Sequence, residues 1–252
     1  MHFGEKTGGR YQMLGSAYQI IQAGTYHCPD SFKDILRQYQ EKDYQLDYEY
    51  RRFYSAYDQI EDPSAFEPLR DLVENIYTNE YLETLLPKWS NAIQESDALT
   101  ALPLQRDFYS RNLKNAKERT VVIISDALRY EVGKELFQKM QDDPKCTAKL
   151  EVQLSVLPSY TRLGMAALLP HSELAMTDDF KVLVDGLPCE NLSERETILQ
   201  KYNHDGVCVR FDDIRSLKIA DLRSVFTGKQ VVYVYHNQIC LLYTSDAADD
   251  MQ

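Results

Sequence analysis

Three polar side chains stand where predicted β-strands end, and their chemical types suit the activation of a hydroxyl group. Asp126 follows the β-branched run at residues 121–124, Thr161 opens a predicted helix, and His236 follows a predicted strand at residues 231–235. Because reactive groups gather at the carboxyl ends of parallel strands, we expect the three to converge on one cleft. The sequence therefore predicts a carboxylate, a hydroxyl and an imidazole in a single site.

The chemistry that fits this set is metal-assisted attack on a phosphate ester. A threonine hydroxyl is a weak nucleophile near neutral pH, and binding to a divalent cation favours its alkoxide. The same cation offsets negative charge on a phosphoryl oxygen. Asp126, Thr161 and His236 are the predicted metal ligands, with zinc as the expected metal, and Thr161 is the predicted nucleophile. Arg129 and the N–H groups that begin the Thr161 helix are predicted to hold the phosphate.

Each of these residues also has a purely structural interpretation. An Asp or Thr at the start of a helix is often only a cap. A His at the end of a strand is more often structural, and Arg129 on a helix is most often a solvated side chain. From the spacing alone, both interpretations stay open.

The elements that must position these groups begin with a helical part before residue 118. Helices are predicted at residues 30–39, 46–57 and 68–87, where apolar side chains recur at three- and four-residue steps. The first is expected to be capped by Asp30 or Ser31, and the last to end near Pro87. Residues 90–103 are predicted to form a loop.

Beyond residue 118, predicted strands and helices alternate. The strands are predicted at residues 121–124, 150–157, 182–184, 206–211 and 231–235, and the helices at residues 127–140, 161–169, 193–202 and 219–226. This alternation predicts an α/β domain with a mainly parallel sheet. The run at residues 121–124 is expected to be buried on both faces. Asp126 is expected to cap the helix that follows it, and Ser193 to open a capping box.

The composition is that of a globular protein, since 44 % of the 252 residues are hydrophobic and 27 % are charged. No apolar run is long enough to span a bilayer, and the first residues lack the layout of a signal peptide. Scattered cysteines without CxxC spacing indicate reduced thiols and a cytoplasmic location. They are Cys28, Cys146, Cys189, Cys208 and Cys240. The formal net charge of -11 argues against a protein that coats nucleic acid non-specifically.

Three segments resemble the signatures of the PglZ family. They are Val-Ile-Ile-Ser-Asp-Ala-Leu-Arg-Tyr-Glu at residues 122–131, Leu-Pro-Ser-Tyr-Thr-Arg-Leu-Gly-Met-Ala-Ala-Leu-Leu-Pro at residues 157–170, and Tyr-Val-Tyr-His-Asn-Gln-Ile at residues 233–239. The helical segment, with Arg-Phe-Tyr at residues 52–54 and Glu-Asn-Ile-Tyr at residues 74–77, is similar to the region that precedes the domain in type A members. The likeness extends from Tyr11 to Ile239.

PglZ proteins belong to the alkaline phosphatase superfamily and act in the BREX phage-exclusion system. The resemblance implies a helical N-terminal region followed by an incomplete alkaline-phosphatase-like domain. It also implies two bound divalent metals, a phosphate ester substrate, and other BREX proteins as partners. In related nucleotide pyrophosphatases the nucleophile lies in a Pro-Thr-x-Thr segment, which residues 158–161 match in outline. Thr161 thus inherits the nucleophile role, and Asp126 and His236 inherit ligand roles.

The sequence departs from the family after Ile239, where an Asp and then a Gly-Asp element are expected. Residues 240–252 instead resemble a translated sequencing adapter. We therefore expect a helical region at residues 1–118, the first part of a PglZ domain at residues 119–239, and a non-native tail. Because later metal ligands would then be missing, the chain is expected to be a fragment with little or no hydrolase activity.

Two alternatives to a hydrolase stay open. In the first, the parent protein is an assembly component of the defence complex, and its phosphatase-like site is structural. In the second, it is a nucleic-acid-binding module that uses Arg51 and Arg52, the compact basic pair of the helical part. The metal content of the parent, with and without Asp126→Ala, distinguishes the hydrolase from the assembly component.

Overall fold

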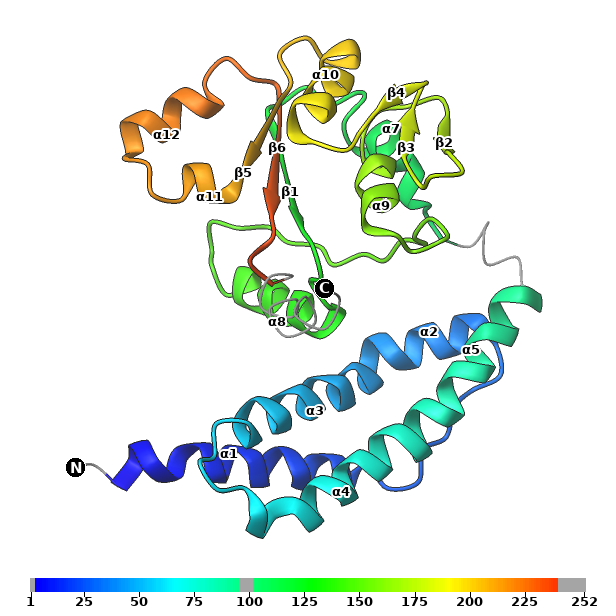
Figure 1. Cartoon of the computed structure of the whole chain (residues 1–252), viewed down its shortest axis with the longest axis vertical. Coiled ribbons are helices and arrows are strands. Elements are labelled where there is room, and N and C mark those ends of the chain that lie inside the picture. The colour runs from blue at the N-terminus through cyan, green and yellow to red at the C-terminus, as the bar shows by residue number, and fades with distance from the viewer. Residues whose placement is uncertain (1–2, 96–101, 240–252) are drawn as a thin grey trace. The chain divides into compact units, whose positions relative to one another are not determined.

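The computed structural model describes residues 3–95 and 102–239 (Figure 1). Its contacts divide the chain into two compact units. The helical unit takes residues 1–98 and 129–150, and the α/β unit takes residues 99–128 and 151–252. This division differs from the expected boundary at residue 118, because a helix from the second part of the sequence packs with the N-terminal helices. The expected tail at residues 240–252 lies outside the described residues.

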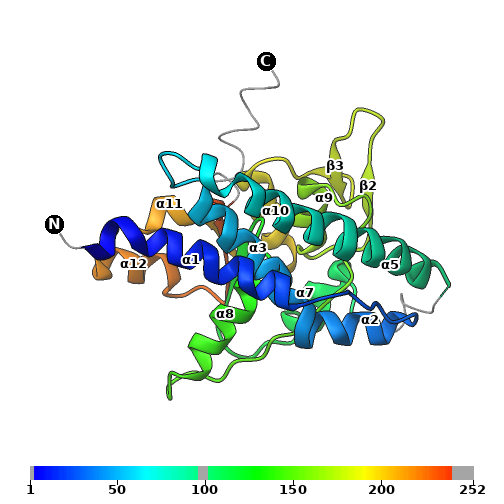
Figure 2. The same cartoon turned by 90° about the horizontal axis from the view of Figure 1, so that it is seen from below.

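The helical unit is built from helices around a core of apolar side chains. Its elements are α1 (Phe3–Gln22), α2 (Phe32–Gln38), η1 (Tyr39–Asp43), α3 (Tyr44–Tyr57), η2 (Ser64–Phe66), α4 (Glu67–Asn75), η3 (Ile76–Leu82), α5 (Glu83–Glu95) and α8 (Tyr130–Gln141). Helix α1 lies along α3 (Figures 1 and 2). Met13, Ala17 and Ile20 of α1 share one buried core with Phe53 and Val73. The segments η1 and η3 are π-helical.

The helix boundaries agree with the sequence in α2 and differ in α5. The Ser31 side chain accepts a backbone N–H and caps α2, as expected. The helix predicted to end near Pro87 continues to Glu95, so the loop prediction is wrong for residues 90–95. Pro87 lies inside this helix, which follows the π-helical segment η3 without a break, and it has no N–H to donate to the carbonyl oxygen one turn before it.

The α/β unit is centred on a parallel sheet, which confirms the predicted fold class. Its strands are β1 (Thr120–Ser125), β6 (Val231–His236) and β5 (Val207–Arg210), in that order. Residues 231–235 of the middle strand β6 are all buried, as expected for a strand covered on both faces. A second, antiparallel sheet contains β2 (Leu174–Met176), β3 (Val182–Val184) and β4 (Leu187–Pro188). The helices are η4 (Gln105–Asp107), α7 (Phe108–Asn112), α9 (Thr161–Ala167), α10 (Leu192–Tyr202), α11 (Phe211–Ile214) and α12 (Ile219–Phe226) (Figure 1).

Strand β1 is less buried than the sequence predicts. Val122 is buried, but the side chains of Val121 and Ile123 are 42 % and 67 % exposed. In the described sheet β1 pairs only with β6, so it is an edge strand. The helix that follows it, α8, packs with the helical unit. The prediction of burial on both faces is therefore wrong, since a run of apolar residues does not by itself fix what covers it.

Helix α10 has a capping box, but a different residue provides it. The Asn191 side chain accepts the Glu194 N–H, and the Glu194 carboxylate accepts the Asn191 N–H in return. Asn is among the most favourable N-cap residues, and its extended backbone allows the helix to begin at Leu192. The box therefore begins two residues before the predicted Ser193.

Gly206, between α10 and β5, permits a close approach of the two elements. A Cβ atom there would lie 2.7 Å from Leu199 Cγ and 3.0 Å from the Asn203 carbonyl oxygen. We predict that Gly206→Ala lowers the free energy of unfolding by about 2 kcal/mol, because buried Leu199 must move. Urea unfolding of the chain measures this. In the control, Gly133→Ala in α8, nothing lies within 4 Å of the new Cβ, and a gain of about 0.5–1 kcal/mol is expected. Equal stabilities of the two variants would contradict the prediction.

Among the helices that the structure describes, none is long and apolar enough to cross a membrane. Cys28, Cys146, Cys189 and Cys208 are free thiols, in agreement with the prediction of unpaired cysteines. Burial raises the pKa of Cys189 to about 11 and that of Cys208 to about 12. Both thiols are therefore protonated and weakly reactive near neutral pH.

Candidate functional site

The carboxyl ends of β1 and β6 bring Asp126 and His236 together at one edge of the sheet. Ser125 is paired in register with His236, and the Asp126 N–H donates a hydrogen bond to the His236 carbonyl oxygen at 3.1 Å. Asp126 does not cap the next helix as predicted, because α8 begins at Tyr130 with Arg129 as its N-cap. The Asp126 carboxylate is therefore not occupied in starting that helix.

The backbone turns sharply directly after Asp126. Ala127 has a φ of 60°, in the left-handed region that residues other than glycine rarely adopt. Its N–H donates a hydrogen bond to Asp126 Oδ1 at 3.1 Å, which holds the carboxylate beside the turn. Strained backbone of this kind clusters at functional sites in known proteins. The turn is thus a second reason, independent of the strand end, to consider Asp126 functional.

The imidazole of His236 is held from two sides within the α/β unit. Its Nδ1 lies 2.9 Å from Ser125 Oγ, and the Phe211 ring meets it edge-on with ring centroids 4.8 Å apart. When Nδ1 carries the proton and donates it to Ser125, the Nε2 lone pair is left for a metal ion. Sequence reasoning missed Ser125, because its contact with His236 depends on the register of β1 against β6.

Thr161 and Asp126 line the same cavity, which has a volume of about 300 Å³. Thr161 is the first residue of α9 and is exposed. Within the described residues its hydroxyl has no hydrogen-bond partner, so it forms no cap bond. Ser125, Ser159 and Gln105 also line the cavity, whereas His236 is not among the described residues that do. The structure thus places Thr161 and Asp126 on one cavity. His236 does not line that cavity among the described residues, but its ring contacts Ser125, which does.

The segment before α9 is not a β-strand, and hydrogen bonds to residues 103–105 hold it. The strand predicted at residues 150–157 is reduced to an isolated bridge at Leu154. Gln105 Oε1 accepts the Val156 N–H at 3.1 Å, and Gln105 Nε2 donates to the Gly164 carbonyl oxygen at 3.1 Å. The backbone of Leu154 adds two hydrogen bonds at 2.8 Å, since its N–H donates to the Pro103 carbonyl oxygen and its carbonyl oxygen accepts the Gln105 N–H. The Gln105 side chain extends this contact and ties the segment to α9. Sequence reasoning missed this residue as well.

Gln105→Ala is expected to lower the free energy of unfolding by about 2 kcal/mol, because it leaves two backbone groups without partners. Chemical denaturation of the chain measures the effect. Gln153→Ala, at an exposed position of the same segment, should change stability by less than about 0.5 kcal/mol. A Gln105 variant as stable as the unaltered chain would show that the segment does not depend on this side chain.

Arg129 belongs to a different unit from the other predicted site residues. It is the N-cap of α8 in the helical unit, whereas Asp126 and Thr161 belong to the α/β unit. Burial raises the pKa of Tyr77 in the helical unit, and the positive charge of Arg129 opposes that rise. The predicted contact of Arg129 with a phosphate stays a prediction.

The described residues do not complete a metal centre. Nowhere among them do three His, Cys, Asp or Glu side chains gather so that they could hold a metal ion. Asp126 and Thr161 give the cavity one carboxylate and one hydroxyl, whereas structural zinc sites have four protein ligands and catalytic ones three. Their oxygens suit a divalent cation, but they are too few to hold it alone.

Comparison with known proteins places this architecture in a class. The profile described as "BREX system PglZ alkaline phosphatase-like domain" matches residues 108–252. The matched part includes β1, α9 and β6, and so contains Asp126, Thr161 and His236. The class of protein is therefore alkaline phosphatase-like.

The chain belongs to the PglZ family of BREX systems, which confirms the resemblance read from its three segments. It is 39 % identical over 236 residues to the alkaline phosphatase-like protein PglZ of Bacillus cereus. The aligned region covers 91 % of this chain and 28 % of that protein. It is 35 % identical over 228 residues to the alkaline phosphatase-like protein BrxZ of Escherichia coli. The aligned region covers 85 % of this chain and 26 % of that protein. The chain thus spans about a quarter of the length of these curated relatives.

Proposed function

We propose that the full-length protein is a phosphoester hydrolase of a BREX phage-defence system, and that this chain carries its nucleophile Thr161 and its first metal ligand Asp126. The observation that carries the proposal is that these two residues, far apart in the sequence, line one cavity. Phosphate monoesters or diesters are the proposed substrates, and other BREX proteins are the proposed partners. The proposed location is the cytoplasm.

The surroundings of these side chains support this assignment. The Thr161 hydroxyl is not used as a helix cap, and the Asp126 carboxylate is held by the Ala127 N–H. We propose that His236 acts as a ligand through Nε2, with Ser125 as the residue that positions it. The proposed cofactor is a divalent cation, with zinc as the expected metal. Its remaining ligands are proposed to lie in the part of the full-length relatives that this chain does not span.

The test is metal binding and hydrolysis by a full-length relative such as PglZ of Bacillus cereus. Alanine at the position that aligns with Asp126 is expected to weaken metal binding by about 10-fold or more, measured by elemental analysis after dialysis. Hydrolysis of an aryl phosphate or a phosphodiester should fall with it. Alanine at the position that aligns with Asp178, an exposed carboxylate of the α/β unit, is the control. A relative that holds no metal yet assembles with other BREX proteins would overturn the proposal and favour the assembly role.

The 252-residue chain itself is expected to hydrolyse aryl phosphates and phosphodiesters poorly or not at all. Its described residues do not complete a metal centre, so neither zinc nor manganese should be held firmly enough for turnover. The rate of release of the aryl product measures this. Turnover by the chain that disappears in Thr161→Ala would contradict the prediction.

A further inference from the structure

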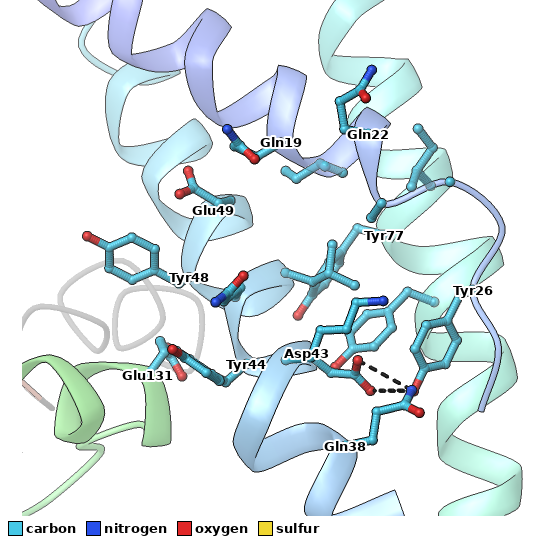
Figure 3. A pocket seen from close by; sticks show the side chains of 18 of the residues that line it. Gln19, Gln22, Tyr26, Gln38, Asp43, Tyr44, Tyr48, Glu49, Tyr77 and Glu131 are labelled. Atoms are coloured by element: carbon cyan, nitrogen blue, oxygen red, sulfur yellow. Dashed lines mark hydrogen bonds between the residues drawn. The ribbon is translucent and has the colours of Figure 1, made fainter. Parts of the chain in front are cut away.

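The helical unit contains a cavity of about 660 Å³ lined by tyrosine and carboxylate side chains (Figure 3). The tyrosines include Tyr26, Tyr44, Tyr77 and Tyr81, and the buried carboxylates are Asp43 and Glu131. All of these residues belong to the helical unit. The cavity is therefore separate from the one that Asp126 and Thr161 line, and the proposed hydrolase function does not use it.

Two π-helical segments supply side chains to this cavity. Asp43 is the last residue of η1, and Tyr77 and Tyr81 lie in η3. The π-helix is rare, and its turns are frequent at functional sites in known proteins. Here two such segments, distant in the sequence, direct side chains to one cavity. The irregular backbone therefore coincides with the place where a ligand would be held.

Asp43 is a buried carboxylate whose hydrogen-bond donors are all uncharged. It is 2 % exposed, and it accepts hydrogen bonds from the Tyr26 hydroxyl at 2.7 Å and from Gln38 Nε2 at 3.1 Å (Figure 3). The ion pairs of the described residues do not include it. A carboxylate removed from water without a counter-ion is unfavourable. A cation that enters the cavity would relieve this.

Two further groups in the cavity wall are buried and lack hydrogen bonds. Tyr81 is 1 % exposed, and its hydroxyl has no partner in the described structure. Glu131 Oε1 forms an ion pair with Arg51, whereas Glu131 Oε2 has no hydrogen-bond partner there. Burial raises the pKa of Tyr81 far above its usual value, so its hydroxyl stays neutral and its oxygen can accept. The Tyr81 oxygen and Glu131 Oε2 can thus accept N–H groups, so a ligand with N–H donors fits these positions.

The aromatic rings of the cavity already lie close to cations of the chain itself. Lys134 Nζ lies 5.7 Å from the ring centroid of Tyr44, within the range of a cation–π interaction. The rings of Tyr26 and Tyr81 meet edge to face with centroids 4.8 Å apart. Tyrosine rings beside a carboxylate can stabilise both an ammonium group and the alkyl chain that carries it.

We propose that this cavity binds a primary alkylammonium group, with Asp43 as its counter-ion and the Tyr81 hydroxyl as an acceptor for one of its N–H groups. The buried Asp43 carboxylate, which the ion pairs of the described residues do not include, favours a cationic ligand over a phosphate-bearing one. The ammonium group belongs either to a free diamine or to a lysine side chain of a partner protein, since both present the same chemistry.

The test is calorimetric titration of the chain with 1,4-diaminobutane at low ionic strength, with n-butanol as the uncharged comparison. Saturable binding of the diamine and none of the alcohol is expected. Asp43→Asn should weaken binding by about 10-fold, and Tyr81→Phe by about 5-fold. Tyr81→Phe keeps the ring and removes a hydroxyl that has no hydrogen-bond partner in the described structure. The melting temperature of this variant should therefore not fall below that of the unaltered chain. A loss of affinity without a loss of stability is a result that a purely structural role would not produce.

Matched controls are Asp71→Asn and Tyr18→Phe, at exposed positions of the same unit outside the cavity. Both should bind the diamine as the unaltered chain does. A short peptide with one lysine and blocked ends distinguishes the two sources. Tighter binding of the peptide indicates a partner protein, and tighter binding of the diamine indicates a small molecule. The proposal is overturned if neither amine binds more tightly than n-butanol, or if Asp43→Asn and Tyr81→Phe both bind as the controls do.

Discussion

Alanine at the position that aligns with Thr161 is expected to reduce phosphoester hydrolysis by a full-length PglZ relative by about 10³-fold or more, because it removes the attacking oxygen. Serine there keeps a hydroxyl on the first residue of α9 and is expected to retain much of the rate. The measurement is kcat and kcat/KM for an aryl phosphate and a phosphodiester at saturating metal. Circular dichroism of each variant establishes that it is folded.

Ser159→Ala, made at its aligned position, is the matched control for this series. Ser159 lines the same cavity as Thr161 and loses the same functional group, but it precedes α9 and is not a proposed nucleophile. Its variant is expected to keep most of the rate. If the Thr161 alanine variant were as active as this control, the hydrolase proposal would have no nucleophile in this chain.

Arg51→Met is expected to lower the free energy of unfolding of the helical unit by about 3 kcal/mol, as when one partner of a buried ion pair is removed. Arg51 pairs with Glu131, and their side chains are 23 % and 2 % exposed. Without Arg51, the charge of Glu131 would stay buried with no counter-ion. Urea unfolding followed by tryptophan fluorescence measures this, because the one tryptophan of the sequence, Trp89, packs on Phe32 in the same unit.

Arg52→Met provides the control at the adjacent position. Arg52 Nη1 lies 3.8 Å from Glu49 Oε1, and the Arg52 side chain is 42 % exposed. Its loss should therefore lower the free energy of unfolding by no more than about 0.5 kcal/mol. Hydrogen exchange adds a local measurement. Amides of α8 should exchange faster in Arg51→Met, because Glu131 anchors that helix, and should be unchanged in Arg52→Met. Unchanged exchange in both variants would show that the ion pair does not hold α8.

The apolar pattern predicts an element well where the element's own neighbours cover it. Residues 193–202 are predicted as a helix and are observed within α10, whose Ile198 and Leu199 are buried, and β6 occupies the buried centre of the sheet that its apolar run predicts. The pattern fails where a side chain distant in the sequence takes the backbone hydrogen bonds that the predicted element would have made. Residues 150–157 alternate like a strand, but Gln105 takes the Val156 N–H that a neighbouring strand would have bonded. The predicted helices also begin only at residue 30, whereas α1 already fills residues 3–22.

In the candidate site, too, the sequence predicts some features and misses others. Local spacing places Asp126 after a strand and Thr161 at the start of a helix, and the structure has both residues at those positions. The contact between Ser125 and His236 depends on the register of two strands that are far apart in the sequence, and spacing along the chain does not encode register. The position of Arg129 depends on which unit α8 packs with, and the pairing of Glu131 with a residue of α3 contributes to that choice.

The ion pair between Arg51 and Glu131 also has a consequence for biosynthesis. The chain leaves the α/β unit after Leu128, forms α8, and returns at Glu151. A ribosome that has released only the N-terminal helices has not yet made the carboxylate that Arg51 requires, so their interior cannot be completed until α8 has emerged. For the same reason, proteolytic cleavage at a single point between the units cannot release either of them intact, because each is assembled from two separated stretches of the polypeptide.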